Sequence, residues 1–221
     1  MTKVTEARRA GEFILSEAPG YRSRETVVID SSQTLLAGQV LGKITQGAKT
    51  ATPAAGVPAP AGATISTATA ALNTKVGTHL FTCIVGGAGA ASKWRHTDPD
   101  GKVIGVATAG TPYAGGGLSA ITITDSGADP SAGETFGVPV TMAAASDRYV
   151  MHDPEALNGV EVAAGILFDA VTTGAGETAK AVAIVRDAEV NLALLDWDDQ
   201  DAGEKTAALA TLAAAGIIAR S

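Results

Sequence analysis

The chain has 221 residues, of which 26 are glycine, 46% are hydrophobic and only 4% are aromatic. A chain of this length can bury a substantial core, and its hydrophobic content excludes wholesale disorder. The net charge of −7 argues against nucleic-acid binding, and the single cysteine excludes an internal disulfide. No stretch has the pattern of a membrane span or a secretory signal, so we expect synthesis in a reducing cytoplasm and no membrane partner.

The charge is distributed unevenly along the chain. Residues 1–50 carry seven basic and five acidic side chains, whereas residues 148–221 carry five basic and twelve acidic ones. A basic start and an acidic end suit head-to-tail contacts or contacts with a partner. A solvated acidic surface explains the same distribution equally well, and the sequence leaves both interpretations open.

The first 24 residues predict an arm and not a folded element. Charged and small residues surround one apolar group, Phe13-Ile14-Leu15, and Pro19-Gly20 then interrupts the chain. The β-branched run at residues 26–29 predicts a strand. Residues 35–44 predict a pair of short strands.

The composition changes at residue 50. Residues 50–71 are almost wholly Ala, Thr, Pro and Gly, which is typical of a linker or a weakly structured passage. Beyond it, short β-type runs separated by turn sequences predict a small all-β unit. These runs cover residues 76–85, 102–108, 118–124 and 135–142.

The last third of the chain predicts more strands and one helix. The apolar runs cover residues 160–168, 179–185 and 190–197. Asp201 is a candidate N-cap with Glu204 three residues later, the spacing of a capping box. Alanines and leucines fill the helix that follows, and Gly216 is well placed to end it.

Patterns that would carry catalysis are incomplete. The run at residues 38–44 is one residue short of a phosphate-binding loop and has Ile44 where Mg²⁺ coordination needs a hydroxyl. Ser119 lacks the second glycine of a nucleophile elbow, and Cys83 lies in an apolar run typical of the core. We therefore expect no catalytic residue and no enzyme activity.

Metal-binding patterns are incomplete too. His79, His96 and His152 are widely separated and lack metal-ligand spacing. The acidic group formed by Asp196, Asp198, Asp199 and Asp201 resembles the start of a calcium loop, but its sixth position is an aspartate where that loop requires glycine. Negative charge before a helix is stabilising in any case. We expect no metal site and no cofactor.

Several segments resemble lambda-type bacteriophage head decoration proteins. The first are EFILSEAPGYRSRE at residues 12–25 and LLAGQVLGK at residues 35–43. Later segments that resemble the family are residues 159–168, 181–190, 195–197 and 212–218. The resemblance covers about residues 10–48 and 148–220. About a hundred residues intervene where short members of the family have a brief loop.

The resemblance implies a mainly β fold. In this arrangement residues 25–49 and 148–221 form a β-clip-like core with a short C-terminal helix, and residues 50–147 form an inserted β-rich domain. It implies a homotrimer that binds the major capsid protein on the outer surface of the phage head, at three-fold and quasi-three-fold positions. Such a protein stabilises the expanded head against the pressure of packaged DNA.

The resemblance also implies that residues 1–24 are a flexible capsid-binding arm that becomes ordered on the capsid. We expect Phe13, Ile14 and Leu15 to anchor this arm, and the basic side chains to pair with capsid carboxylates. The expected arm residues are Phe13, Ile14, Leu15, Tyr21, Arg22 and Arg24. An alternative places residues 13–15 in the core of the subunit itself.

A different function is an alternative. The protein could be a virion surface protein whose inserted domain binds a host cell or a glycan. Exposed aromatic side chains would mark such a site, and the insert offers Phe81, Trp94, Tyr113 and Phe136.

Overall fold

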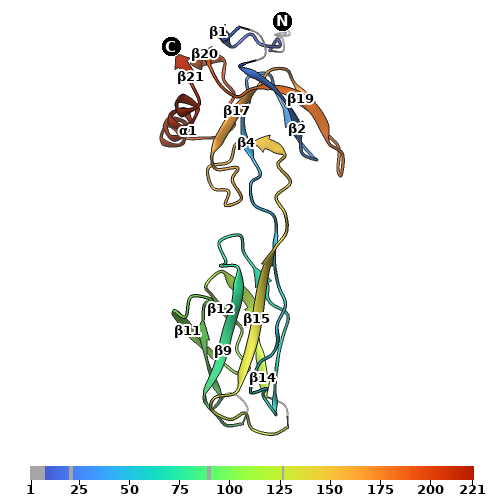
Figure 1. Ribbon diagram of the computed structural model, residues 1–221, viewed down its shortest axis with the longest axis vertical. Helices are drawn as coiled ribbons and strands as arrows, with labels where there is room; N and C mark the ends of the chain where they lie inside the picture. The colour runs from blue at the N-terminus through green and yellow to red at the C-terminus, as the bar shows by residue number, and fades with distance from the viewer. Residues whose placement is uncertain (1–7, 20–21, 89–90, 126) are drawn as a thin grey trace, which may run out of the picture. The chain divides into compact units, whose positions relative to one another are not determined.

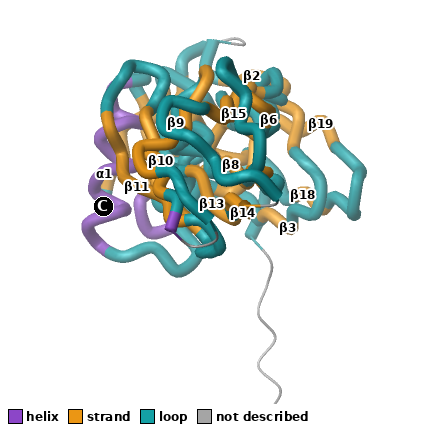
Figure 2. Tube along the Cα trace, turned by 90° about the horizontal axis from the view of Figure 1, so that it is seen from below, coloured by secondary structure: helices purple, strands orange, loops and turns teal. Residues whose placement is uncertain are grey.

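The computed structural model describes residues 8–19, 22–88, 91–125 and 127–221 (Figure 1). Strands predominate in it, and the described residues contain one α-helix, α1 (Figure 2). The mainly β fold class with a short C-terminal helix is therefore confirmed.

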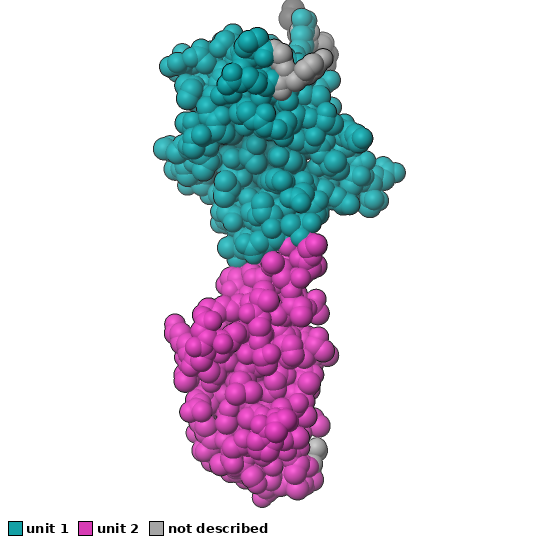
Figure 3. Space-filling view, in the orientation of Figure 1, with its two compact units in different colours: residues 1–46, 145–221 teal, residues 47–144 magenta. Residues whose placement is uncertain are grey.

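The chain folds as two compact units, coloured separately in Figure 3. The first unit comprises Met1–Gln46 and Ala145–Ser221, and the second comprises Gly47–Ala144. Each unit has its own hydrophobic core. The boundaries that the resemblance implies, 49/50 and 147/148, lie three residues later along the chain.

The first unit contains a closed five-stranded barrel in the order β16-β2-β19-β17-β4. Its strands are β2 (Arg24–Ile29), β4 (Val40–Lys43), β16 (Tyr149–Met151), β17 (Ala163–Leu167) and β19 (Ala179–Ile184). Alternation in β2 turns Val27 and Ile29 inward, where they pack against Leu41 and Leu167. Gly42 is required in β4, because a Cβ there would lie 2.3 Å from the carbonyl oxygen of Val160.

A three-stranded sheet in the order β1-β20-β21 completes the first unit. It consists of β1 (Ile14–Glu17), β20 (Ala188–Asn191) and β21 (Ile217–Arg220), and a two-stranded sheet joins β3 (Thr34–Leu35) to β18 (Val171–Thr172). A 3₁₀ turn, Leu192–Leu194, follows β20. Phe13, Val190, Leu212 and Ile217 belong to the core that the sheet shares with α1 (Ala202–Ala214).

The predicted limits of the helix are confirmed. The Asp201 carboxylate accepts a hydrogen bond from Glu204 N at 2.9 Å, and the Glu204 carboxylate accepts one from Asp201 N at 2.7 Å. These reciprocal bonds satisfy two of the donors that a helix N-terminus leaves unpaired. Gly216 follows the helix with a φ of +79°, a left-handed conformation that favours glycine.

The second unit is all β. Its largest sheet has the order β11-β10-β9-β15-β5, with β6 also paired to β15. Its strands are β5 (Lys49–Ala51), β6 (Ala54–Ala55), β9 (Gly77–Val85), β10 (Lys93–Thr97), β11 (Val103–Thr108) and β15 (Thr135–Met142). Two smaller sheets contain β7 (Ala63–Ile65), β8 (Thr69–Ala70), β12 (Tyr113–Gly115), β13 (Leu118–Ile121) and β14 (Ile123–Asp125). The core lies between inward side chains of β9, β10 and β15 and those of β13 and β14.

Residues 50–71 are not a linker, so that expectation was wrong. They contribute β6, β7 and β8 and most of β5, which pair with β15, β14 and β13. Alanine, proline and glycine disfavour strands, so the strand pairing here is set by partners about 50 to 90 residues away along the chain. The sequence therefore shows a linker-like composition where the structure has edge strands.

Candidate functional site

The N-terminal segment lies against the first unit as a strand. β1 pairs antiparallel with β20, with Ile14 opposite Val190. Gly11 N donates to Phe168 O at 2.8 Å, and Asn191 N donates to Phe13 O at 2.7 Å. The described part of residues 1–24 is thus integrated in the subunit, whereas the sequence predicted an arm without a strand.

The three apolar residues of this segment have different environments. Phe13 is 1% exposed and belongs to the core, and Ile14 packs partly against the same core. Leu15 is 55% exposed. The structure thus places Phe13 in the core of the subunit, as the alternative interpretation predicted. Capsid contacts by this segment stay a prediction, and Leu15 is the apolar side chain available for them.

Arg22 and Arg24, the two arginines expected in the arm, make ion pairs within the subunit. Arg24 donates from Nε to the Glu17 carboxylate at 2.9 Å and stacks its guanidinium 4.2 Å from the centroid of the Phe168 ring. This hydrogen bond from Arg24 lowers the pKa of Glu17. Arg22, with 72% of its side chain exposed, pairs with Asp187 at 3.0 Å. Tyr21 lies outside the described residues.

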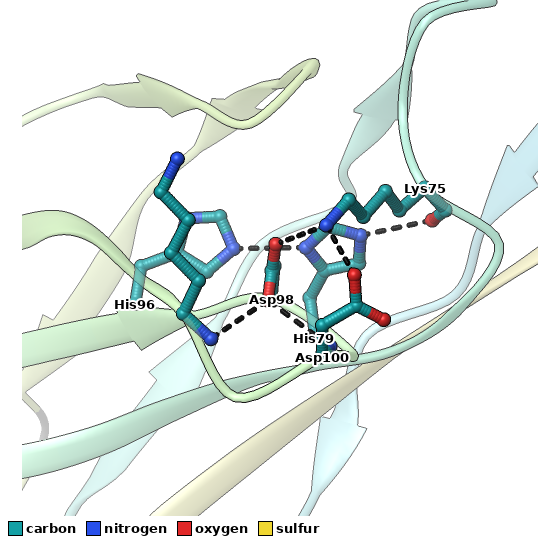
Figure 4. Close-up of polar contacts among 6 residues, drawn as sticks. Lys75, His79, His96, Asp98 and Asp100 are labelled. Atoms are coloured by element: carbon teal, nitrogen blue, oxygen red, sulfur yellow. Dashed lines mark hydrogen bonds and ion pairs between the residues drawn. The ribbon is translucent and has the colours of Figure 1, made fainter.

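The second unit contains a buried polar chain that the sequence did not predict (Figure 4). His79 on β9 and His96 on β10 are both completely buried, and His79 Nδ1 lies 3.0 Å from His96 Nε2. His79 Nε2 lies 3.0 Å from the carbonyl oxygen of Lys75, and His96 Nδ1 lies 3.0 Å from the Tyr113 hydroxyl. The histidines are 17 residues apart, so the antiparallel pairing of β9 with β10 brings them together.

A charged group borders this chain. The Lys75 ammonium pairs with Asp98 at 2.9 Å and also with Asp100. The Asp98 carboxylate is nearly buried and accepts further hydrogen bonds from the backbone N–H groups of Asp100 and Lys102. These bonds, with that of Lys75 the largest, lower the pKa of Asp98. The arrangement satisfies a buried carboxylate and offers no unpaired nucleophile.

The other candidates from the sequence have structural roles. Residues 40–43 form β4, and Cys83 is buried in the second core, where burial raises the pKa of its thiol. His152 is held by Gln200 and by the carbonyl oxygen of Glu161. Across the part of the chain that the structure describes, no group of three or more His, Cys, Asp or Glu is arranged to hold a metal ion.

The aromatic residues of the insert do not form an exposed platform. Phe81, Trp94 and Phe136 are buried in the core of the second unit, and Tyr113 packs partly buried against it. All four aromatic side chains of the insert are thus used for packing, and the feature that would mark a glycan site is missing among the described residues.

Comparison with known proteins identifies the family. Residues 3–217 match the family described as bacteriophage lambda head decoration protein D. The match covers nearly the whole chain, including the second unit. The chain belongs to this family. The lambda-type resemblance seen in the sequence is thereby confirmed, and the role of this head decoration protein is in the phage capsid.

Other comparisons add little. No curated protein sequence matches the chain. Among solved structures, the chain is similar to FlgL of Xanthomonas campestris at 14% identity and a TM-score of 0.31, over 49% of this chain and 34% of that chain. The chain thus spans about a third of the length of that protein, and a similarity at this level does not indicate a shared fold. No helix among the described residues has the length and apolar character needed to cross a bilayer.

Proposed function

We propose that this decoration protein binds the major capsid protein on the outer surface of the phage head as a homotrimer. It occupies three-fold and quasi-three-fold positions and stabilises the expanded head against the pressure of packaged DNA. The observation that carries the proposal is the family match over residues 3–217. We also propose that the protein is made in the cytoplasm of the bacterial host and has no enzyme activity.

The edge of β1 that is unpaired among the described strands supports a contact between this strand and the capsid protein. β1 has one partner, β20, and no described strand pairs with its other side. The edge of a strand carries unpaired N–H and C=O groups that an extended segment can join by backbone hydrogen bonds. Leu15 adds an exposed apolar side chain to the same strand. We assign this edge to the capsid contact.

Trimer formation explains how modest contacts give stable attachment. One exposed leucine and an exposed arginine contribute little affinity alone, since burial of such an apolar side chain contributes about 1.5–3 kcal/mol and an exposed ion pair about 0–1 kcal/mol. Three linked copies of the same contact bind with an avidity far above that of one copy. A trimer on a three-fold position presents three copies at once.

Sedimentation tests both parts of this proposal. The purified chain is mixed with expanded heads that lack their decoration protein, and the pellet is analysed after centrifugation. We expect the chain in the pellet, and a mass of three chains for the free protein in sedimentation equilibrium. A folded chain that stays in the supernatant would contradict capsid binding, and a monomer both free and on the head would contradict the trimer.

A further inference from the structure

The inserted unit buries two imidazoles in contact with each other. His79 and His96 have no solvent-exposed surface. The His96 ring stacks on Phe81, with ring centroids 4.5 Å apart and planes inclined by 5°. A buried histidine without a carboxylate on its ring nitrogens is stabilised in the neutral form, because burial disfavours the charged form.

One acceptor fixes the direction of the hydrogen bonds that link His79, His96 and Tyr113. The carbonyl oxygen of Lys75 can only accept, so His79 must donate from Nε2. Neutral His79 then accepts at Nδ1 from His96 Nε2–H. Neutral His96 in turn accepts at Nδ1 from the Tyr113 hydroxyl. All three groups are satisfied when both imidazoles are neutral.

An added proton disturbs this arrangement. It must go to one of the two Nδ1 atoms, which already accept hydrogen bonds. A proton on His96 Nδ1 requires the Tyr113 hydroxyl to rotate, and a proton on His79 Nδ1 requires His96 to change its tautomer. A second proton would place two cations with ring nitrogens 3.0 Å apart. Phe81 on the ring face offers no acceptor, and burial together with the neighbouring His79 lowers the pKa of His96 to about 4.

The charged groups around the pair do not remove this cost. Asp98 favours the charged form of His96, but its carboxylate is already paired with Lys75. Asp100 also pairs with Lys75. Lys102 and His79 line the same cavity of about 270 Å³, together with Asn73 and Gly116. The buried His79 ring thus borders a cavity of the inserted unit.

We propose that the His79–His96 pair is an acid-sensitive element that keeps the inserted unit closed at neutral pH and opens it under mild acid, while the first unit stays folded. The unfolded insert takes up a proton on His96 below a pH of about 6.5, whereas the closed insert disfavours this proton because the ring is buried beside His79. The free energy of unfolding of the insert is therefore highest above pH 6.5 and falls as the pH is lowered toward 4. This property is independent of the capsid contact proposed above.

Hydrogen exchange of the full chain, followed by mass spectrometry of its peptides, reports each unit separately. After correction for the intrinsic exchange rate, we expect the protection of β9 and β10 to fall at least about tenfold between pH 6 and pH 4.5. We expect the protection of β17 and β19 to change much less over the same range. Equal protection of β9 and β10 at the two pH values would overturn the proposal.

Two variants assign the effect. The double variant His79→Gln, His96→Gln removes both imidazoles, and we expect it to lose the pH dependence of the insert. His152→Gln removes the buried histidine of the first unit and should leave that dependence unchanged. A double variant with the wild-type pH dependence would overturn the proposal. If the double variant does not fold, NMR titration of the wild-type protein decides: a His96 ring that stays neutral down to about pH 5 supports the proposal, and titration of the His96 ring near pH 6.5 overturns it.

Discussion

Phe13 and Leu15 are two residues apart in sequence and have opposite environments. Substitutions at the two positions can therefore test the stability of the first unit and the proposed capsid contact separately. Phe13 is in the core of the first unit, and Leu15 is exposed on β1. We expect Phe13→Ala to lower the free energy of unfolding of the first unit by about 3–5 kcal/mol, because it leaves a cavity. Urea unfolding followed through Trp197 fluorescence, with Trp94 of the second unit replaced by Phe in both chains, measures this change.

Leu15→Ala is the matched variant. We expect it to leave the unfolding of the first unit within about 0.5 kcal/mol of wild type, since the side chain is exposed. Its occupancy on expanded heads should fall. Full occupancy by Leu15→Ala would show that this edge of the subunit does not contact the capsid, and a large loss of stability would contradict its exposed position.

Glu17 gives a pH prediction for the same strand. The hydrogen bond from Arg24 lowers the pKa of Glu17, so the folded chain binds this proton less readily than the unfolded chain. The resulting stabilisation is present above a pH of about 4.5 and is lost as the pH falls below it. We expect the protection of β1 against hydrogen exchange to decline in that lower range. Glu17→Gln should have weaker protection at neutral pH and a smaller decline, and an identical decline in this variant would contradict the role of Glu17.

The environments of single residues in this segment could be predicted only in part. The apolar group at residues 13–15 indicated that this segment buries apolar side chains, either on the capsid or in the core of the subunit. It did not show which side chain is buried, because three adjacent apolar residues fit either face of a strand. Phe13 faces inward because β1 pairs with β20, whose sequence lies more than 170 residues away. The His79–His96 contact was missed for the same reason.

Among the elements, α1 depends on a local signal that can be tested. Asp201→Ala removes the side-chain acceptor for Glu204 N, and we expect it to lower the stability of the first unit by about 0.5–2 kcal/mol. Asp199→Ala, at an exposed position two residues earlier, is the control and should change stability much less. Thermal unfolding monitored by circular dichroism measures both. Equal effects of the two substitutions would contradict the capping role.

Elements with local signals were predicted, and elements that depend on distant partners were not. The helix with its capping box and the apolar strands β9, β15 and β19 follow from patterns within a few residues. β10 was missed because four of the five residues in its sequence, Lys-Trp-Arg-His-Thr, are polar or charged. In the structure its exposed and buried side chains alternate. β1, β16 and β21 are short strands stabilised by pairing within the unit.

The molecule as a whole allows the insert to be removed. The two chain segments that lead to it are already hydrogen-bonded in the first unit, with Ile44 N donating to Arg148 O at 2.9 Å. A short Gly-Ser loop in place of Gly47–Ala144 can therefore join them without strain. We expect the shortened chain to keep the unfolding midpoint of the first unit, the trimer and capsid binding. Failure of the shortened chain to fold would contradict the independence of the first unit.

Function at this scale could be predicted from resemblance and not from chemistry. The residues offered no catalytic or metal pattern, and binding surfaces of a structural protein leave few sequence signals of their own. Segments such as LSEAPGYRSRE identified the family, and the family match over residues 3–217 then established it. The geometry adds that Leu15 is the exposed side chain among the apolar residues 13–15.

Electron cryo-microscopy of decorated heads tests the central claim most directly. Expanded heads are saturated with the full chain and with the chain that lacks Gly47–Ala144, and the two reconstructions are compared. The account predicts trimeric density on the outer surface at three-fold and quasi-three-fold positions in both, with additional density for the insert in the first. Density confined to other positions, or undecorated heads in the presence of folded protein, would contradict it.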